Sequence, residues 1–321
     1  MDNLQRTLIS MENWQHLESD ADASANHVLP TEDGGNWEAR WVQRTCDYGI
    51  VYVSSHTGCA LSCRFCHLTA TGQTMMTPAG EVEYLAQLDQ SLRTYEQRRD
   101  RGEIPPVGRF HVNFMARGEA LKNRNLLTNS HAIFERMRER LEQSQPGAEH
   151  RFLVSSILPA RLEFDLDHVL SDQDVDLYYS LYSLNPGFRR RWLPKAMTGE
   201  AGLDLCTRYQ QKTGKRVALH WAFIKGQNDS DQDVDAILEA IHRRGLRCKF
   251  NLVRYNPHDE RHGEEADEET IQRHFRKIAD ALGDPDSRIV PRVGYDVKAS
   301  CGMFVGERRA RRVATGDDAQ A

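Results

Sequence analysis

The sequence lacks the features that place a protein in a membrane or outside the cell. Over its 321 residues, no apolar run approaches the ~18 residues needed to cross a bilayer. The opening stretch, MDNLQRTLISMENWQHLESDADASANHV, is acidic and lacks the basic and apolar regions of a secretion signal. With 39% hydrophobic and 28% charged residues, the composition is typical of a globular protein. We therefore expect a cytoplasmic protein with no membrane partner.

The seven cysteines lack the even number and regular spacing of a disulfide framework. In a reducing compartment, thiols are more often ligands, nucleophiles or core fillers than members of disulfides. Cys206 lies in a helical pattern and Cys248 opens an apolar run, so both are expected to fill the core. Three others fall within the short stretch GCALSCRFC at the spacing C-x3-C-x2-C: Cys59, Cys63 and Cys66.

A strong excess of basic residues is also missing, since the formal net charge is −5. Overall charge therefore does not indicate a polyanionic partner, and it does not exclude one, because basic residues cluster locally. The clusters are RRR at residues 189–191, HRRGLR at residues 242–247 and ERRARR at residues 307–312. Each is either a solvated face or tail, or a contact with a polyanion.

From about residue 37, the chain alternates between apolar runs and helical patterns. Six runs are each followed by a helical pattern: GIVYVSSHT, RFHVNFMA, RFLVSSIL, VDLYYSLY, RVALHWAFI and KFNLVRY. Such strand-then-helix units predict an α/β fold with a parallel sheet, wound into a barrel or an open doubly wound arrangement. Residues 1–36 are polar and end in the turn signal EDGG, so we expect a leader there and not a domain.

Polar residues follow five of the six predicted strands. They are Cys59, Cys63 and Cys66 after the first strand, Gly118 and Glu119 after the second, Ser155 and Ser156 at the end of the third, Ser180 and Tyr182 after the fourth, and Asn256 and Pro257 after the sixth. The carboxyl ends of parallel strands meet at one mouth, where such folds place their chemistry. The sequence therefore predicts a single active site at this mouth.

Two kinds of metal centre compete for the three clustered cysteines. Zinc prefers four ligands in structural sites, usually as two pairs, and the second pair is missing. His56, His67 or Cys46 could supply a fourth ligand, but none completes a standard pattern. A four-iron cluster held by three thiolates leaves one iron open to bind a reactant. The spacing therefore favours a [4Fe-4S] cluster, and it is the signature of radical S-adenosylmethionine (SAM) enzymes.

Six motifs resemble, in order and spacing, the RlmN/Cfr family of class A radical SAM methyltransferases. The matching segments are YVSSHTGCALSCRFC, FMARGEAL, YSLYSLNPGFRRRWLP, FIKGQNDS, FNLVRYNP and DVKASCGMF. The resemblance implies a radical SAM partial (βα)6 barrel over residues 37–305, followed by a basic, then flexible tail at residues 306–321. It also implies methylation of an adenine carbon in RNA, with a [4Fe-4S] cluster and SAM as cofactors.

The resemblance assigns further roles to individual residues. Cys301, in DVKASCGMF, matches the cysteine that takes a methyl group from a first SAM, and a radical from a second SAM then activates that methyl group. Glu38 matches an upstream glutamate that accepts a proton, if one residue is inserted. The implied SAM contacts are Gly118, Glu119, Ser155, Ser180, Tyr182 and Asn256. The implied partners are a nucleic acid, with RNA favoured, or a nucleotide, and an external electron donor such as flavodoxin or ferredoxin. We expect a monomer.

One departure from the family pattern affects the chemistry directly. Tyr52 stands where the family carries a second cysteine, which releases the product from Cys301 by forming a disulfide. A phenol cannot perform thiol exchange. Three hypotheses follow: an RNA methyltransferase in which Cys46 or another group ends the crosslink, a radical SAM enzyme repurposed for another reaction on a nucleotide or nucleic acid, or a non-catalytic RNA- or zinc-binding relative.

Overall fold

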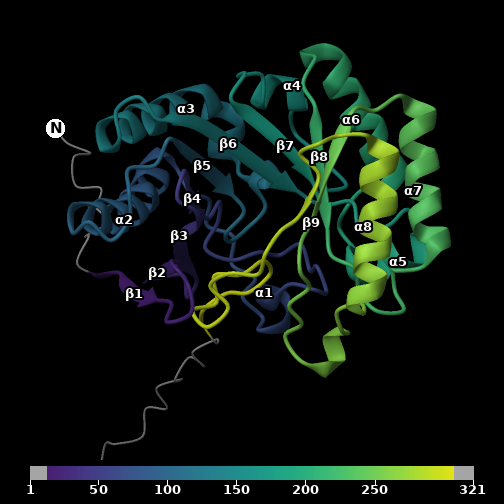
Figure 1. The fold of residues 1–321 in the computed structure, drawn as a ribbon, viewed down its shortest axis with the longest axis horizontal. Helices are drawn as coiled ribbons and strands as arrows, with labels where there is room; N and C mark the ends of the chain where they lie inside the picture. Colours follow the sequence, from purple (N-terminus) through teal and green to yellow (C-terminus); the bar gives the residue numbers. More distant parts are fainter. Residues whose placement is uncertain (1–12, 307–321) are drawn as a thin grey trace, which may run out of the picture.

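The computed structural model describes residues 13–306, in which ten strands form one sheet in chain order from β1 to β10. The first four strands pair antiparallel: β1 (Gln15–Glu18), β2 (Ala25–Pro30), β3 (Asn36–Thr45) and β4 (Tyr48–Tyr52). From β4 onward every neighbouring pair is parallel. The sheet curves into an open partial barrel with β1 and β10 (Arg288–Ile289) at its edges (Figure 1).

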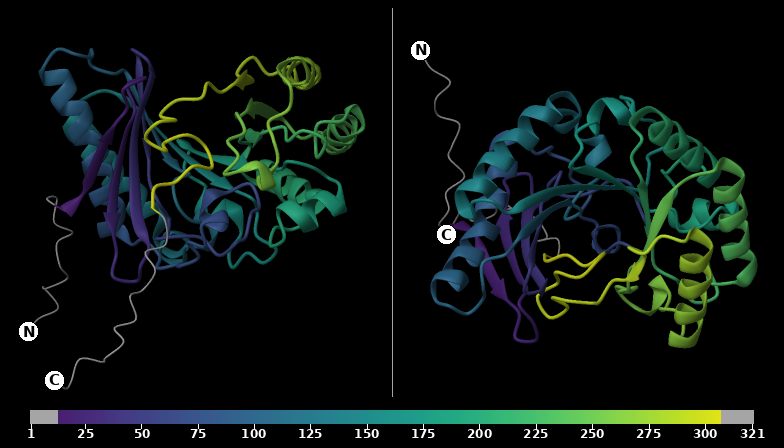
Figure 2. Two further views of the ribbon diagram at one scale, coloured as in Figure 1. Left: turned by 90° about the horizontal axis from the view of Figure 1, so that it is seen from below. Right: turned by 45° about the horizontal axis from the view of Figure 1, so that its top comes forward.

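The six predicted strand-then-helix units are all present. Their strands are β4, β5 (Arg109–Phe114), β6 (Glu149–Ser156), β7 (Val175–Tyr179), β8 (Val217–Trp221) and β9 (Cys248–Leu252). Their helices are α2 (Glu81–Asp100), α3 (Arg124–Ser144), α4 (Leu166–Val169), α6 (Gly199–Thr213), α7 (Asp231–Arg244) and α8 (Glu268–Leu282). The helices cover the outer, convex side of the sheet (Figure 2, right). The predicted partial (βα)6 barrel is confirmed.

Two strands lie inside the stretch that the sequence indicates to be a polar leader. The apolar pattern is weak there because β2 buries polar side chains that have hydrogen-bond partners. Asn26 donates to Glu38 over 2.8 Å, and His27 bonds Thr94 over 3.1 Å. These strands extend the sheet, whereas residues 1–12 of the predicted leader and residues 307–321 of the predicted tail lie outside the described part of the chain.

Local capping explains where several helices begin and end. Thr198 accepts a hydrogen bond from the backbone of α6, and Ser230 does the same for α7. Gly214 and Gly245 end these helices with φ values of +70° and +60°, a conformation that glycine adopts without steric strain. These signals fix the helix lengths, and so they fix where each following strand starts.

The core lies between the sheet and the helices. Trp41 on β3, Tyr95 on α2 and Phe110 on β5 pack with ring centroids 5.3 to 6.4 Å apart. Cys206 and Cys248 are buried free thiols, which confirms their predicted role as core fillers. No helix within residues 13–306 is both long and apolar enough to cross a membrane.

The connections at the carboxyl ends of the strands build the inner side of the barrel. They contain α1 (His67–Ala70), η2 (Ala120–Lys122), α5 (Pro186–Trp192) and η3 (Glu260–His262). After α8 and β10 the chain returns across this inner side as an irregular segment, residues 290–306, which we call the C-terminal strap. Figure 2 (left) shows the strap in yellow above the dark-blue segment that carries α1.

Candidate functional site

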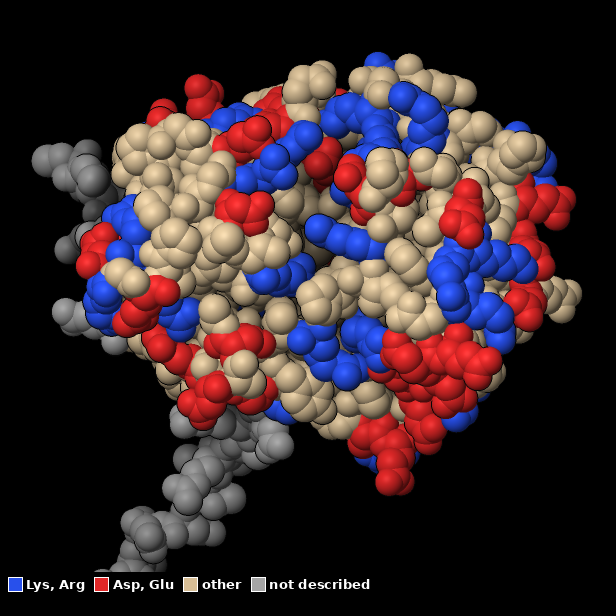
Figure 3. All heavy atoms as spheres, viewed as in Figure 1, with Lys and Arg blue, Asp and Glu red and all other residues tan. Residues whose placement is uncertain are grey.

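One cavity on the inner side of the barrel brings together ten of the eleven predicted site residues. Those that line it are Cys59, Cys63, Cys66, Gly118, Glu119, Ser155, Ser180, Tyr182, Asn256 and Cys301. Basic side chains surround a hollow in the face shown in Figure 3, and acidic ones gather near the start of α8. Because the residues that line the cavity come from the ends of different strands, the cavity supports the prediction of a single site at the mouth of the barrel.

The loop that carries the three clustered cysteines is held in a tight conformation. A Cβ atom on Gly58 would lie 2.6 Å from the carbonyl oxygen of Gln73, so no larger residue fits there. The next amide, that of Cys59, donates to the same carbonyl over 2.9 Å. Ser62 adopts a φ of +60°, which is uncommon for a residue other than glycine. These constraints turn the cysteine side chains toward the cavity.

The three thiols are close enough to affect each other's ionisation. Burial raises the pKa of Cys59 to about 12, and Cys66 adds to this rise. Burial raises the pKa of Cys66 to about 11, and burial with both neighbours raises the pKa of Cys63 well above its usual range. Because the thiolate is the ligating form, a bound iron centre has to displace these protons.

The donor set fits a cluster held by three thiolates better than a four-ligand zinc site. His67 Nε2 lies 3.1 Å from the carbonyl oxygen of Asn256, and His56 Nδ1 lies 3.1 Å from Ser55 Oγ. These two imidazoles are the histidines nearest the cysteines in sequence, and both have hydrogen-bond partners of their own. Cys46 lies exposed in the β3–β4 turn, outside the cavity lining.

Phe65, between the last two cysteines, stacks on Tyr182. Their ring centroids are 4.4 Å apart and the planes differ by 16°. Tyr182 has a φ of +60°, a strained conformation that a side chain of this size rarely adopts. Such strain persists where the surroundings impose it, and it concentrates at functional sites. The stack therefore fixes one wall of the cavity against the cysteine loop.

Gly118 and Glu119 form a second wall. Gly118 has a φ of +90°, and a Cβ atom there would lie 2.6 Å from Ser55 Oγ and from His56 Nδ1. The buried carboxylate of Glu119 accepts hydrogen bonds from the backbone amides of Leu121 and Ile157, each over 3.2 Å. Burial raises the pKa of Glu119 to about 7. A cationic ligand at this position would stabilise the ionised form.

His220 on β8 is a cavity residue that the sequence analysis missed. Its Nε2 lies 2.9 Å from Ser155 Oγ and 2.5 Å from Ser180 Oγ, so one imidazole orients both predicted serines. Burial lowers the pKa of His220 to about 4, and the ring is therefore neutral near pH 7. The run RVALHWAFI predicts a strand, but only the register of that strand shows which residues point inward.

Asn256 connects the cavity to the C-terminal strap. Its Nδ2 donates to the backbone carbonyl oxygen of Cys301 over 2.9 Å. Its Oδ1 is buried and has no hydrogen-bond partner among residues 13–306. Because a buried polar atom without a partner is costly, this oxygen is suited to accept a hydrogen bond from a ligand.

Glu38 does not line the cavity, although the resemblance assigns it a catalytic role. Its Oε1 accepts from Arg40 Nη2 over 2.7 Å and its Oε2 from Arg117 Nε over 2.8 Å, with all three side chains buried. Burial alone would raise the pKa of Glu38, but the two guanidinium groups outweigh it and hold the pKa below its usual range. The geometry is that of a positioning residue with both oxygens occupied.

The two arginines of this network hold the strap. Arg40 donates to the carbonyl oxygens of Ala299 over 3.1 Å and Met303 over 2.6 Å. Arg117 donates to the carbonyl oxygen of Val305. Arg117 lies in the matching segment FMARGEAL, but the resemblance assigned no role to it or to Arg40. The buried network therefore fixes the backbone on both sides of Cys301.

Cys301 and Tyr52 face the same space. The thiol of Cys301 is accessible within the cavity, where the loss of surrounding water raises its pKa, while Arg40 and Arg44 act in the opposite direction. Tyr52, at the end of β4, also lines the cavity, and its hydroxyl lies 3.4 Å from Arg44 Nη2. Tyr52 and Cys301 thus both line the cavity.

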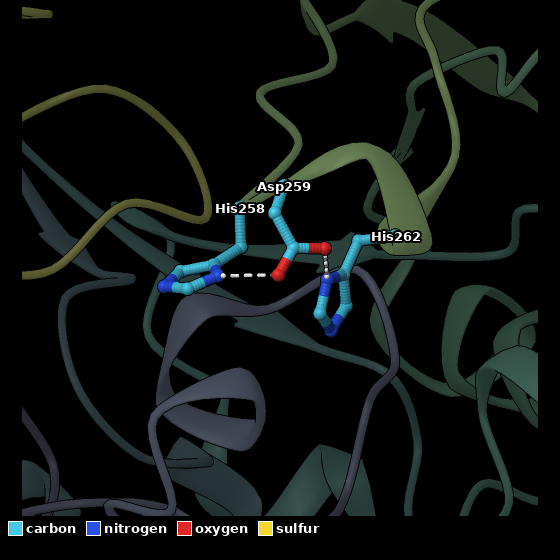
Figure 4. A group of neighbouring side chains, drawn as sticks. All are labelled: His258, Asp259 and His262. Carbon is cyan, nitrogen blue, oxygen red and sulfur yellow. Dashed lines mark hydrogen bonds and ion pairs between the residues drawn. The ribbon is translucent and has the colours of Figure 1, made fainter.

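A second group of possible metal ligands lies in the loop that follows Asn256. Figure 4 shows the imidazoles of His258 and His262 on either side of the Asp259 carboxylate. The Nδ1 of His262 lies 2.7 Å from Asp259, and Arg261 pairs with the same carboxylate over 2.7 Å. Because these neighbours already bind both oxygens, the arrangement is an ion-paired network that stiffens the loop.

The chain is similar in sequence to proteins of known family. No family model matches the chain. It is 32% identical over 299 residues to the probable dual-specificity RNA methyltransferase RlmN of Synechococcus sp. (strain CC9311), covering 90% of this chain and 79% of the relative. It is 27% identical over 298 residues to the dual-specificity RNA methyltransferase RlmN 2 of Myxococcus xanthus (strain DK1622), covering 90% and 73%.

Solved structures show the same fold. The crystal structure of a radical SAM methyltransferase from Sphaerobacter thermophilus matches with a TM-score of 0.70 and 23% identity, covering 91% of this chain and 81% of that one. Streptococcus suis SuiB bound to its precursor peptide SuiA matches with a TM-score of 0.52 and 11% identity, covering 79% of this chain and 50% of that one.

Proposed function

Because the chain belongs to the RlmN family of radical SAM RNA methyltransferases, we propose that it methylates an adenine carbon of RNA with Cys301 as the methyl carrier. The observation that carries the proposal is the shared cavity, which joins the three clustered cysteines, the predicted SAM contacts and Cys301. A bound [4Fe-4S] cluster and SAM supply the radical chemistry that an unreactive adenine carbon requires. Cys59, Cys63 and Cys66 are the residues that would hold the cluster.

The walls of the cavity suit the functional groups of SAM. The carboxylate of Glu119 can accept a charge-assisted hydrogen bond from an ammonium group, and the free Oδ1 of Asn256 offers a second acceptor. Ser155 and Ser180, both oriented by His220, present hydroxyl groups that can bond the ribose. Each of these side chains comes from a different strand end, so the sheet sets their spacing.

The strap presents Cys301 to this cavity in a fixed conformation. Its backbone is held by Arg40 and Arg117, and Asn256 bonds the carbonyl oxygen of Cys301 itself. A carrier thiol has to meet first a methyl donor and then the substrate base. Holding the backbone while leaving the thiol accessible favours that role, because a fixed geometry reduces the entropic cost of reaction.

Tyr52 favours a second candidate function. Because a phenol cannot take a sulfur atom by thiol exchange, the release step of the family has no agent at this position. Cys46, the exposed cysteine of the β3–β4 turn, is not among the residues that line the cavity. The alternative is a repurposed radical SAM reaction on a nucleotide or nucleic acid, in which Cys301 keeps the group that it attaches or serves another role.

We further propose that the enzyme acts as a monomer on RNA and takes electrons from an external protein donor. Arg44 lines the cavity, has no acidic partner within residues 13–306 and can attract a phosphate of a nucleic acid. Arg254 and Arg292 also line the cavity, where both pair with Glu265. Chemistry on a base requires the base to leave its stack, so a single-stranded or loop adenine is the expected target.

The proposal is tested with iron-reconstituted protein, methyl-labelled SAM and an RNA pool. Wild-type protein and a Cys206→Ala control should transfer label to RNA, either free or in a covalent adduct with the protein, and Cys301→Ala should transfer none while keeping its iron content. Equal labelling of RNA by Cys301→Ala would exclude the carrier role. Label in nucleotides or DNA, with none in RNA, would support the second candidate.

A further inference from the structure

In the basic run at residues 189–191, the first side chain is buried and the other two are exposed. Arg189 is buried and donates to the carbonyl oxygens of Leu181 over 2.7 Å and Met197 over 2.5 Å. Arg190 and Arg191 are exposed on the outer face of α5. The first arginine therefore stabilises the fold, and the other two remain available to a partner.

The end of α5 packs directly on the loop of clustered cysteines. The amide of Arg64, which lies between Cys63 and Cys66, donates to the carbonyl oxygen of Trp192 over 2.9 Å. The guanidinium of Arg64 lies 5.6 Å from the centre of the Trp192 ring. Lys195 Nζ donates to the carbonyl oxygen of Ala60 over 2.5 Å. Arg64 belongs to this loop and Lys195 contacts it, while Arg190 and Arg191 lie exposed on the helix whose last residue packs on it. We call Arg64, Arg190, Arg191 and Lys195 the cluster-side patch.

None of these four cations has an acidic partner within residues 13–306. Arg191 Nη1 lies 3.5 Å from Oε1 of Gln227, which is an uncharged side chain. The other basic run of the barrel is different, because Arg243 and Arg244 both pair with Glu200. A group of unpaired positive charges attracts an anionic surface and raises the rate of encounter with it.

We propose that the cluster-side patch is the docking site for an acidic one-electron donor protein. This inference rests on the proposed function, since a cluster that cleaves SAM must first be reduced. In each docking event the donor would be oxidised by one electron, and the cluster would gain that electron. The patch suits this task because Arg64 belongs to the cysteine loop and Lys195 contacts it, so a partner bound there lies next to the redox centre.

An RNA substrate has a different basic surface available. Arg44 lines the cavity that contains Cys301 and has no acidic partner within residues 13–306, while Arg254 and Arg292 line the same cavity and pair with Glu265. Figure 2 (left) shows the strap on the upper side of the barrel and the segment with α1 on the lower side. Arg64, Arg190, Arg191 and Lys195 are not among the residues that line the cavity, so the cluster-side patch is a separate set of cations, and it adjoins the cysteine loop through Arg64 and Lys195.

The test uses iron-reconstituted protein and a flavodoxin as the acidic donor. The variant Arg190→Glu/Arg191→Glu reverses two exposed charges of the patch. The control Arg93→Glu/Arg276→Glu makes the same change in net charge at exposed positions on α2 and α8 that have no ion pair within the described residues. For the patch variant, calorimetry at low salt should show a rise of at least about tenfold in the Kd for flavodoxin, and this rise should become smaller at high salt. The control variant should show no such rise.

A second readout follows reduction of the cluster through its visible absorbance. Reduced flavodoxin should reduce the patch variant at least about tenfold more slowly than the control, whereas dithionite should reduce both at the same rate because it needs no protein docking. Equal flavodoxin affinities for the two variants would overturn the proposal. So would a loss of RNA affinity in the patch variant with flavodoxin binding unchanged, which would make the patch an RNA surface.

These outcomes remain separable from the proposed methylation. Donor affinity and cluster reduction are measured without RNA and without any methylated product. If the patch variant alone loses flavodoxin binding and no RNA is ever methylated, docking stands and the methylation proposal fails. If RNA is methylated and both variants bind flavodoxin equally, the methylation proposal stands and the docking proposal fails.

Discussion

Asn256 donates a hydrogen bond from Nδ2 to the backbone carbonyl oxygen of Cys301 over 2.9 Å, while its Oδ1 remains buried without a partner among residues 13–306. One amide therefore faces both the predicted SAM site and the proposed methyl carrier. Asn256→Ala should weaken SAM binding by roughly tenfold, because one hydrogen bond to a charged or polar group contributes about 1.5 kcal/mol. It should also speed amide exchange in residues 297–304. The exposed Asn129→Ala change on α3 serves as the control, and unchanged SAM affinity and exchange in Asn256→Ala would contradict this role.

Glu119 predicts how SAM binding depends on pH. Burial raises the pKa of Glu119 to about 7, so its carboxyl loses charge as the pH falls through neutrality. The ionised form is the one that pairs with an ammonium group, and the ionised fraction falls about tenfold for each pH unit below the pKa. SAM affinity of the wild type should therefore fall between about pH 7.5 and about pH 6.

Glu119→Gln should bind SAM more weakly and lose most of this pH dependence. Calorimetry over the same pH range, with the exposed Glu135→Gln as control, makes the comparison. Parallel pH profiles for wild type and Glu119→Gln would show that another group controls SAM binding.

Glu38 should stabilise the fold and hold the strap in place. Removing its charge leaves Arg40 and Arg117 buried without their anionic partner, a change that costs about 3 kcal/mol or more. Glu38→Gln should lower the free energy of unfolding by that amount in denaturant titrations, and increase amide exchange around Cys301. A Glu38→Gln protein of wild-type stability that fails only in product formation would support a direct proton-accepting role.

The same residue gives the protein a sensitivity to acid. The pKa of Glu38 is lowered in the folded state, so its contribution to stability is present above the pKa of an unfolded glutamate and is lost as the pH falls through the folded pKa. The acid limb of the stability profile should be shallower in Glu38→Gln than in the wild type.

Much of the fold could be predicted from the sequence because the six parallel strands from β4 to β9 are apolar runs that are each followed by a helix. The two strands within residues 15–30 were missed, since Asn26 and His27 are buried polar residues whose partners lie far along the chain. The cysteine loop was predictable because thiolate ligation imposes a spacing. No comparable spacing exists for Arg117, which acts through residues on β3 and the strap.

The role of single residues was harder to predict than their place. The rule that strand ends meet placed Ser155 and Ser180 at one mouth, but only the register of β8 shows that His220 bonds both. Glu38 was matched by its position along the chain, and its burial between two arginines could not be seen there. Long-range ion pairs leave no periodic pattern in a sequence, which is why this network was missed.

Tyr52 should determine the fate of any adduct on Cys301. Apart from Cys301 and the three cysteines assigned to the cluster, no thiol within residues 13–306 lines the cavity. If the reaction reaches a bridge between Cys301 and the base, the wild type therefore lacks a thiol to resolve it, and a covalent protein–RNA adduct should accumulate. Tyr52→Cys should release methylated RNA, and Tyr52→Phe is the matched control that should behave like the wild type. Denaturing gels of the three proteins with labelled RNA measure the adduct. Equal product release by Tyr52→Phe and Tyr52→Cys would show that position 52 takes no part.

The most direct test of the central claim is mass analysis of the peptide that contains Cys301 after anaerobic incubation of iron-reconstituted protein with methyl-labelled SAM. The proposed function predicts one labelled methyl group on the Cys301 sulfur before RNA is added, and transfer of that label to RNA adenine, free or as an adduct, afterwards. Labelled RNA produced while Cys301 stays unmodified throughout would contradict a cysteine-carried methyl transfer.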